Sequence, residues 1–322
     1  MTAPEDLVLF SERFVIMSSM EPTAHLYVFD TQSDVLSVIE TTLKAANDLA
    51  PWGDASCSPP EQLATHGLDL TQRASGEWQL LAVNHGGRES IEYFSVDQAP
   101  ATGTPSLQWR GCVMAAENAQ FNDVAALPGG GFLATDPISA SWQLPKLLGG
   151  AVGVGSGRVY RWDPESAYRA VPNTEGAYPN GITLSADKQS FYVNYYQEGE
   201  VREHDLESGE ILNRQAVEQP DNSTLTADGS LLVASHHASL FTLLVALTSA
   251  ENERTTIPYS IIAIDTASFS KSVRFYSVGE EMGAGTVAVP VGDDLYVGSF
   301  RGDRLIRVQP PAAPAPRKSL EN

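Results

Sequence analysis

The sequence predicts an all-β protein, a six-bladed β-propeller. Three observations lead to this fold class: one sequence phrase recurs six times, each copy contains a hairpin turn, and most copies begin with an oxygen-bearing side chain. Propellers are built from radially repeated antiparallel sheets around a central channel. The repeat therefore defines the architecture, and the polar positions indicate what the channel holds.

The recurring phrase is a polar residue or glycine, a short alternating strand, a turn and a second apolar strand. Glycine and aspartate occupy the central turns, as at 128–130, 227–229 and 292–294, which is typical of β-hairpins. The copies lie 41 to 64 residues apart and begin at Glu5, His66, Asn122, Asn180, Asp221 and Gly285.

A third strand follows the hairpin in four copies, at residues 90–97, 157–163, 200–205 and 304–308. A hairpin with a third strand and room for a fourth is a propeller blade. Residues 35–49 fit either a short helix or outer strands of the first blade, and the pattern leaves both open. We expect one propeller domain over residues 1–308 and a disordered Pro/Ala-rich tail over 309–322.

Composition excludes several classes of partner. The chain has 322 residues, and 20 basic against 40 acidic residues give a formal net charge of −20. This charge repels phosphate, so neither nucleic acid nor an anionic membrane is an expected partner. Two cysteines, Cys57 and Cys112, are too few for a disulfide framework, and the sequence leaves them free or paired. A signal-peptide pattern is missing near Glu5 and Asp6, which favours a soluble, cytoplasmic protein, while the oligomeric state stays open.

The repeat starts predict a metal site. The first strand of each propeller blade lines the channel, so equivalent starts converge on the axis. Calcium takes about six to eight oxygen ligands in irregular geometry, and the near absence of nitrogen and sulfur donors argues against zinc or copper. At any single position such a residue more commonly binds turn backbone, and the recurrence favours metal. The donors are Glu5, Asp6, Asn122, Asp123, Asn180, Asp221 and Asn222.

Five phrases together resemble the paraoxonase/arylesterase family, at residues 4–19, 81–97, 121–136, 178–205 and 220–236. The resemblance runs from about Pro4 to Val308, with little to align between Asp30 and Gln62. It implies a propeller with two calcium ions, one catalytic and one structural, that hydrolyses lactones and some aryl esters. It also implies a role for His85 as general base. The implied ligands of the catalytic ion are Glu5, Asn122, Asn180, Asp221 and Asn222, and those of the structural ion are Asp6, Asp123 and a backbone carbonyl near Gly87.

The sequence departs from the family pattern at its histidines. A second histidine, which orients the first in the family, is expected near residues 106–108, where this chain has none. We therefore keep Asp221 as an alternative base. For the substrate pocket we expect His236, together with Trp142 and Leu144 from an active-site loop.

The predicted function is a calcium-dependent lactonase and arylesterase. Calcium would polarise the substrate carbonyl, and His85 or Asp221 would activate the attacking water. The alternatives are a sugar-acid lactonase of the gluconolactonase type, a non-catalytic propeller that binds a protein partner, and a metal-free propeller of the strictosidine-synthase type.

Overall fold

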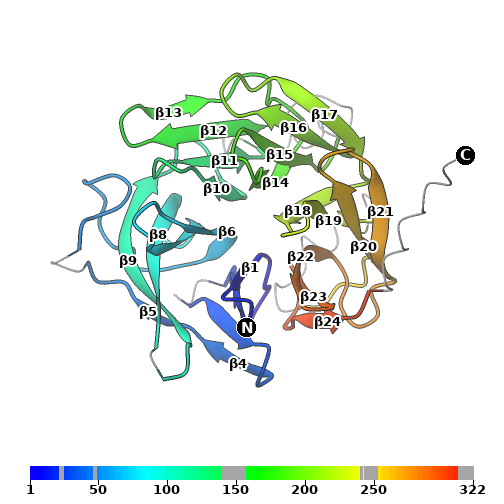
Figure 1. Cartoon of the computed structure of the whole chain (residues 1–322), viewed down its shortest axis with the longest axis horizontal. Helices are drawn as coiled ribbons and strands as arrows, with labels where there is room; N and C mark the ends of the chain where they lie inside the picture. The colour runs from blue at the N-terminus through cyan, green and yellow to red at the C-terminus, as the bar shows by residue number, and fades with distance from the viewer. Residues whose placement is uncertain are drawn as a thin grey trace, which may run out of the picture.

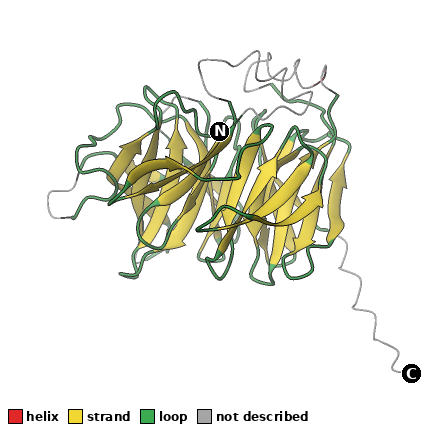
Figure 2. Ribbon diagram, turned by 90° about the horizontal axis from the view of Figure 1, so that it is seen from above, coloured by secondary structure: helices red, strands yellow, loops and turns green. Residues whose placement is uncertain are grey.

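The computed structural model describes residues 1–21, 25–45, 49–99, 101–138, 157–239, 242 and 253–310. Six sheets surround a central axis, as Figure 1 shows, and the N-terminal segment lies near that axis. Seen from the side in Figure 2, the strands cross the thickness of the disc and the turns gather on its two faces. The all-β, six-bladed prediction is confirmed.

Each blade runs outward from the axis in sequence order, with antiparallel neighbours. Blade 1 contains β1 (Leu7–Phe10), β2 (Phe14–Met17), β3 (Tyr27–Asp30) and β4 (Val35–Val38). Blade 2 contains β6 (Thr65–Gln72), β7 (Trp78–Asn84), β8 (Ser90–Gln98) and β9 (Pro105–Met114), with β5 (Glu40–Thr42) added parallel to β9. Blade 3 contains β10 (Val124–Ala126), β11 (Phe132–Asp136), β12 (Arg158–Asp163) and β13 (Ala167–Ala170).

The remaining blades repeat this order. Blade 4 contains β14 (Pro179–Leu184), β15 (Ser190–Tyr195), β16 (Glu200–Asp205) and β17 (Ile211–Ala216). Blade 5 contains β18 (Pro220–Leu225), β19 (Ser230–His236), β20 (Tyr259–Asp265) and β21 (Lys271–Ser277). Blade 6 contains β22 (Gly285–Val291), β23 (Asp294–Ser299) and β24 (Ile306–Val308).

These strands settle the open question at residues 35–49. The segment forms the outer strand β4 of blade 1 and then β5, which joins blade 2, so its first part is strand and not helix. Residues 46–48 lie outside the described residues. Helical periodicity there was misleading because an exposed edge strand needs no regular alternation of apolar and polar residues.

Apolar side chains fill the space between neighbouring blades. Inner strands such as β7 are buried on both faces, whereas the outer strand β17 is largely exposed. Between blades 2 and 3, Phe132 stacks on Trp162 with ring centroids 5.7 Å apart and contacts Tyr93. Each such buried side chain stabilises the fold by roughly 1.5–3 kcal/mol, so the blade interfaces hold most of the core.

Side chains on or beside the inner strands also tie each blade to the next. Carboxylates make three of these junctions: Asp6 accepts the backbone N–H of Leu68 at 2.6 Å, Asp69 that of Ala126 at 2.7 Å, and Asp123 that of Ile182 at 2.8 Å. Because each bond joins a side chain of one blade to the backbone of another, the bonds set the spacing of the blades around the axis. At the other three junctions a side chain donates a hydrogen bond to a backbone carbonyl of the next blade: Thr183 to Ser223 O, His236 to Gly285 O and Thr286 to Glu5 O.

The ring closes where the N-terminal segment meets blade 6. The backbone N–H of Ala3 donates to Gly302 O and that of Ser299 donates to Pro4 O, both at 2.9 Å. Blade 6 thus holds residues 3–5 beside the axis, although Glu5 precedes the first strand. Among the described residues, no helix is long and apolar enough to cross a membrane.

Asp69 makes the fold sensitive to pH. Burial raises the pKa of Asp69 from 3.8 to about 6, although two backbone N–H groups oppose the rise. The folded protein therefore binds this proton more tightly than the unfolded chain. The resulting stability is fully present below about pH 4 and is lost as pH rises through about 6, a change of about 3 kcal/mol.

Urea denaturation between pH 4 and 7.5 measures this effect as the difference in unfolding free energy between the wild type and Asp69→Asn. The difference should fall by about 3 kcal/mol over that range. Parallel pH profiles for the two proteins would mean that Asp69 titrates normally.

Candidate functional site

Two glycines allow the repeat starts to approach one another closely. A Cβ atom on Gly181 would lie 2.7 Å from both Asn222 Cα and the carbonyl oxygen of Asp221, and one on Gly67 would lie 2.4 Å from a carboxylate oxygen of Asp123. Any larger residue at either position would push neighbouring blades apart. The glycines that follow His66 and Asn180 are therefore required for the convergence.

Five oxygen-bearing side chains meet at the axis, each at most 7% exposed: Glu5, Asn122, Asn180, Asp221 and Asn222. Their amide nitrogens have partners, since Asn180 Nδ2 donates to Asp221 Oδ1 at 2.6 Å and Asn222 Nδ2 donates to Glu5 Oε1 at 2.7 Å. Their oxygens do not all have partners. Within the described part of the chain, no hydrogen bond reaches four buried oxygens of this set: Glu5 Oε2, Asn122 Oδ1, Asn180 Oδ1 and Asn222 Oδ1.

Negative charge accumulates at the same place. Burial, the nearby Glu5 carboxylate and that of Asp6 raise the pKa of Asp221 well above its ordinary value, although Asn180 opposes the rise. Buried polar groups without partners are rare in native proteins, and buried charges normally pair or coordinate a metal. No described group of three His, Cys, Asp or Glu side chains is arranged to hold a metal ion. Any cation here would therefore depend on the amide oxygens, which are ligands that calcium accepts.

The residues predicted for a structural ion are placed differently. Both oxygens of Asp6 accept backbone N–H groups, from Leu7 and Leu68, and both oxygens of Asp123 do so as well. Gly87 lies on an exposed turn with open space around it, away from these buried aspartates. That a backbone carbonyl near Gly87 joins Asp6 and Asp123 in a structural calcium site stays a prediction.

His66, which sequence reasoning missed, stands next to His85. His66 Nδ1 is 3.1 Å from His85 Nε2, and His85 Nδ1 is 2.7 Å from Glu89 Oε2. On its other side His66 Nε2 lies 3.5 Å from both Glu5 Oε2 and Asn122 Nδ2. The sequence feature that could have identified His66 is its position at the start of the second repeat, where the other copies carry Asn, Asp, Glu or Gly. A histidine pair is thus complete here without a histidine at 106–108.

The pKa values of the two buried histidines beside the axis, His66 and His236, are shifted in opposite directions. Burial alone would lower the pKa of His66, but the Glu5 and Glu89 carboxylates raise it above its ordinary value. Burial lowers the pKa of His236 to about 4, so His236 is neutral. His66 is therefore the more easily protonated of the two.

The histidine pair opens into a cavity of about 580 Å³. Its lining combines apolar side chains with a few polar ones, which is the usual character of small-molecule sites. Tyr178 stands in this wall with a backbone φ of +61°, a strained conformation for a bulky residue. The lining residues are Met20, His66, His85, Glu89, Gln120, Phe121, Asn122, Pro137, Ile138 and Tyr178.

A second cavity, of about 390 Å³, is lined by other parts of the inner strands, including Asp6, Asp69 and Asp123. The two cavities border different predicted metal ligands. Asn122 borders the cavity of the histidines, whereas its neighbour Asp123 borders the second one.

Of the predicted substrate-pocket residues, His236 lies in the described part of the chain, and it does not line the cavity of the histidines. His236 is 1% exposed. Its Nδ1 atom lies 3.1 Å from the hydroxyl oxygen of Tyr196, and its Nε2 atom lies 3.4 Å from Asp221 Oδ2. It therefore supports the axial residues from behind and is not part of the cavity lining. Trp142 and Leu144 lie outside the described residues.

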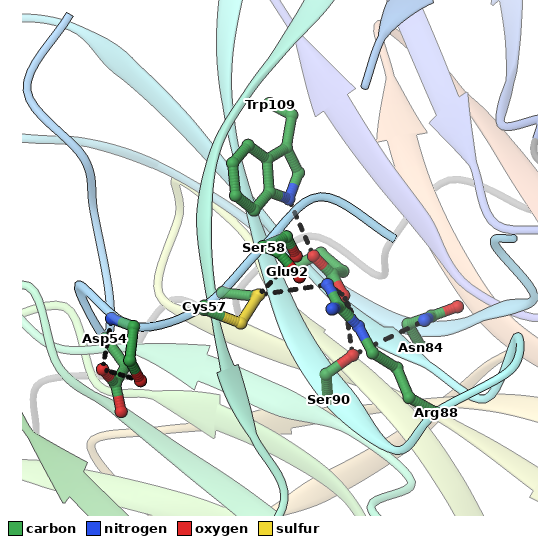
Figure 3. Close-up of a disulfide and its surroundings, with 10 residues drawn as sticks. Asp54, Cys57, Ser58, Asn84, Arg88, Ser90, Glu92 and Trp109 are labelled. Carbon is green, nitrogen blue, oxygen red and sulfur yellow. Dashed lines mark hydrogen bonds and ion pairs between the residues drawn. A yellow bond between two sulfur atoms is a disulfide. The ribbon is translucent and has the colours of Figure 1, made fainter. Parts of the chain in front are cut away.

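A buried network holds the turn that carries His85. Figure 3 shows Arg88 between Glu92 and the disulfide that Cys57 and Cys112 form. Arg88 Nη2 lies 2.7 Å from Glu92 Oε1 and 3.0 Å from Cys112 Sγ. Trp109 and Ser90 also donate to Glu92, which has no exposed surface. The turn after β7 is thereby anchored to β8 and β9.

The chain matches the SMP-30/gluconolactonase/LRE-like family over residues 66–262 and belongs to it. No curated protein matches the chain. A gluconolactonase of Xanthomonas campestris, XC5397, has 17% identity and a TM-score of 0.55, over 96% of this chain and 86% of that one.

Two further solved structures are similar. A luciferin-regenerating enzyme has 14% identity and a TM-score of 0.53, over 93% of this chain and 84% of that one. The calcium-binding protein regucalcin of Agrobacterium tumefaciens has 12% identity and a TM-score of 0.50, over 92% and 82%. At these identities the similarity establishes the fold alone.

The Gly181 contact provides a test of the axial arrangement. Gly181→Ala should destabilise the protein by about 2–3 kcal/mol, because the added methyl group meets the backbone of Asp221 and Asn222. Gly129→Ala is the matched control, since a Cβ there meets nothing within 4 Å. Thermal unfolding of the two variants gives the comparison, and equal melting temperatures would show that blades 4 and 5 do not approach as described.

Proposed function

We propose that the protein is a calcium-dependent hydrolase that opens lactones, with a catalytic calcium at the axis. One observation carries the proposal. Four buried oxygens, on Glu5, Asn122, Asn180 and Asn222, have no hydrogen bond from the described residues, while the amide nitrogen of Asn222 donates to Glu5 and that of Asn180 donates to the buried carboxylate of Asp221. A hard divalent cation would satisfy all of them at once, and calcium tolerates such a mixed carboxylate and amide set.

Calcium bound there would supply positive charge that polarises the carbonyl group of the substrate. The histidine pair supplies the proton transfers. Water adds to the carbonyl carbon and its proton passes to the pair of His66 and His85, which later returns a proton to the ring oxygen as the C–O bond breaks. One lactone and one water thus give one hydroxy acid. Asp221 remains the alternative base.

The cavity favours a lactone with apolar substituents. Its lining includes the apolar side chains of Phe121, Ile138 and Met20, which would exclude water from an acyl chain or an aromatic ring. The same walls would accept the aryl group of an ester, as the resemblance to the paraoxonases implies. Hydrolysis of aryl esters is therefore part of the proposal.

A sugar-acid lactone is the second candidate. Membership of the gluconolactonase-like family and the similarity to a gluconolactonase structure support it. Glu89 and Gln120 would be the hydrogen-bonding partners of sugar hydroxyl groups in the cavity. The two substrate classes differ in the contacts they need, so direct comparison of substrates separates them.

Substrate and metal are tested together. Hydrolysis should be measured on γ- and δ-lactones of increasing acyl length, on gluconolactone and on phenyl acetate, before and after chelation and with calcium or magnesium restored. We expect turnover that rises with acyl length, disappears on chelation and returns with calcium only. Preference for gluconolactone would support the sugar-acid alternative. If calcium raised the melting temperature without any turnover, the propeller would be a binding protein.

The axial ligands are tested by Asn222→Ala. Loss of this amide oxygen should weaken calcium binding at least tenfold and abolish lactone hydrolysis, while the variant stays folded. Isothermal titration with calcium and thermal unfolding measure the two properties. Gln98→Ala, at the exposed end of strand β8, is the control and should match the wild type. Full activity in Asn222→Ala would contradict the proposed calcium site.

A further inference from the structure

Glu89 stands at the outer end of a chain of hydrogen-bonding groups that leads to the axis. Its carboxylate lies 2.7 Å from His85 Nδ1, and His85 Nε2 lies 3.1 Å from His66 Nδ1. The two histidine side chains are 27% and 15% exposed, so both are partly shielded from water. The chain ends at His66 Nε2, 3.5 Å from Glu5 Oε2 and Asn122 Nδ2.

This sequence of contacts determines where the protons lie. An ionised carboxylate only accepts hydrogen bonds, so the proton of neutral His85 is on Nδ1, toward Glu89. His85 Nε2 then carries a lone pair and accepts a hydrogen bond from His66 Nδ1–H. The remaining nitrogen, His66 Nε2, is left with its lone pair directed toward the axis.

We propose that Glu89 is a positioning residue, which acts through His85 to present the lone pair of His66 Nε2 to the axial residues. The inference rests on the proposed lactonase function, within which it assigns His66, and not His85, as the group next to the reacting water. His85 then transmits the influence of Glu89 and disperses charge.

The orientation of Asn122 agrees with this assignment. Its amide nitrogen faces His66 Nε2, as expected if that nitrogen accepts a hydrogen bond, while its oxygen has no hydrogen-bond partner. One side chain thus contacts both the histidine chain and the proposed calcium site. A proton on His66 Nε2 would place two donors opposite each other at Asn122, and would face Glu5 Oε2, also 3.5 Å away, which in the proposed site binds the cation.

The surroundings keep Glu89 available for His85. The neighbouring Arg88 is bound to Glu92 and to Cys112, so its guanidinium group is directed to the buried network behind the turn (Figure 3). Glu92 thus balances the charge of Arg88, and Glu89 is left facing the cavity. The two nearby glutamates therefore have different partners: Glu92 binds Arg88, and Glu89 binds His85.

Glu89→Gln is the central test, because it keeps the size of the side chain and allows the opposite tautomer of His85. We expect kcat for the best lactone to fall about 100-fold, with KM and calcium affinity unchanged. Glu89→Asp, which keeps the carboxylate, should restore most of the loss. The control is Glu218→Gln, which alters a similar carboxylate–histidine pair, 2.9 Å apart, at His237 outside the cavity.

Nitrogen-15 NMR of the imidazoles provides a readout that is independent of turnover. With calcium present at about pH 8, above the ordinary titration range of histidine, wild-type His66 and His85 should both carry their protons on Nδ1. Glu89→Gln should lose this single pattern. A wild-type His85 protonated on Nε2, or identical tautomers in both proteins, would overturn the positioning role. Absence of lactone turnover in a wild type with the expected tautomers would overturn the proposed function instead.

Discussion

Burial of several oxygen-bearing side chains around one axis is the constraint on which the rest of this structure depends. Six blades bring Glu5, Asn122, Asn180, Asp221 and Asn222 out of water, and the amide nitrogens among them already have partners. Burial and the nearby Glu5 carboxylate raise the pKa of Asp221, and four of the remaining oxygens have no hydrogen-bond donor among the described residues. Such an arrangement is costly for an isolated fold, and a bound cation is the simplest physical compensation.

The fold and the site are built from the same strand positions. Adjacent residues have different roles. Asp6 and Asp123 accept hydrogen bonds from the backbone of the next blade, while Glu5 and Asn122 face the axis. Successive side chains of a strand point to opposite sides, so one residue pair can serve both purposes. Any change in the spacing of the blades therefore also changes the geometry of the site.

Sequence reasoning recovered the repeat, the hairpins and the axial residues, because these depend on local patterns of apolar and turn residues. It missed His66, which it counted as a repeat start without assigning chemistry. The contacts of His66 join segments far apart in the chain, for which local pattern carries no information.

By itself the sequence determined the six blades, the hairpin at the start of each and the polar character of the repeat starts, since alternation and turn chemistry are local properties. Tertiary structure alone decided that Cys57 pairs with Cys112, that His66 reaches His85, and that Asp6 and Asp123 bind backbone groups. The reason is physical. Each of these contacts depends on distances set by the closure of the whole ring, and closure is a property of all the blades together.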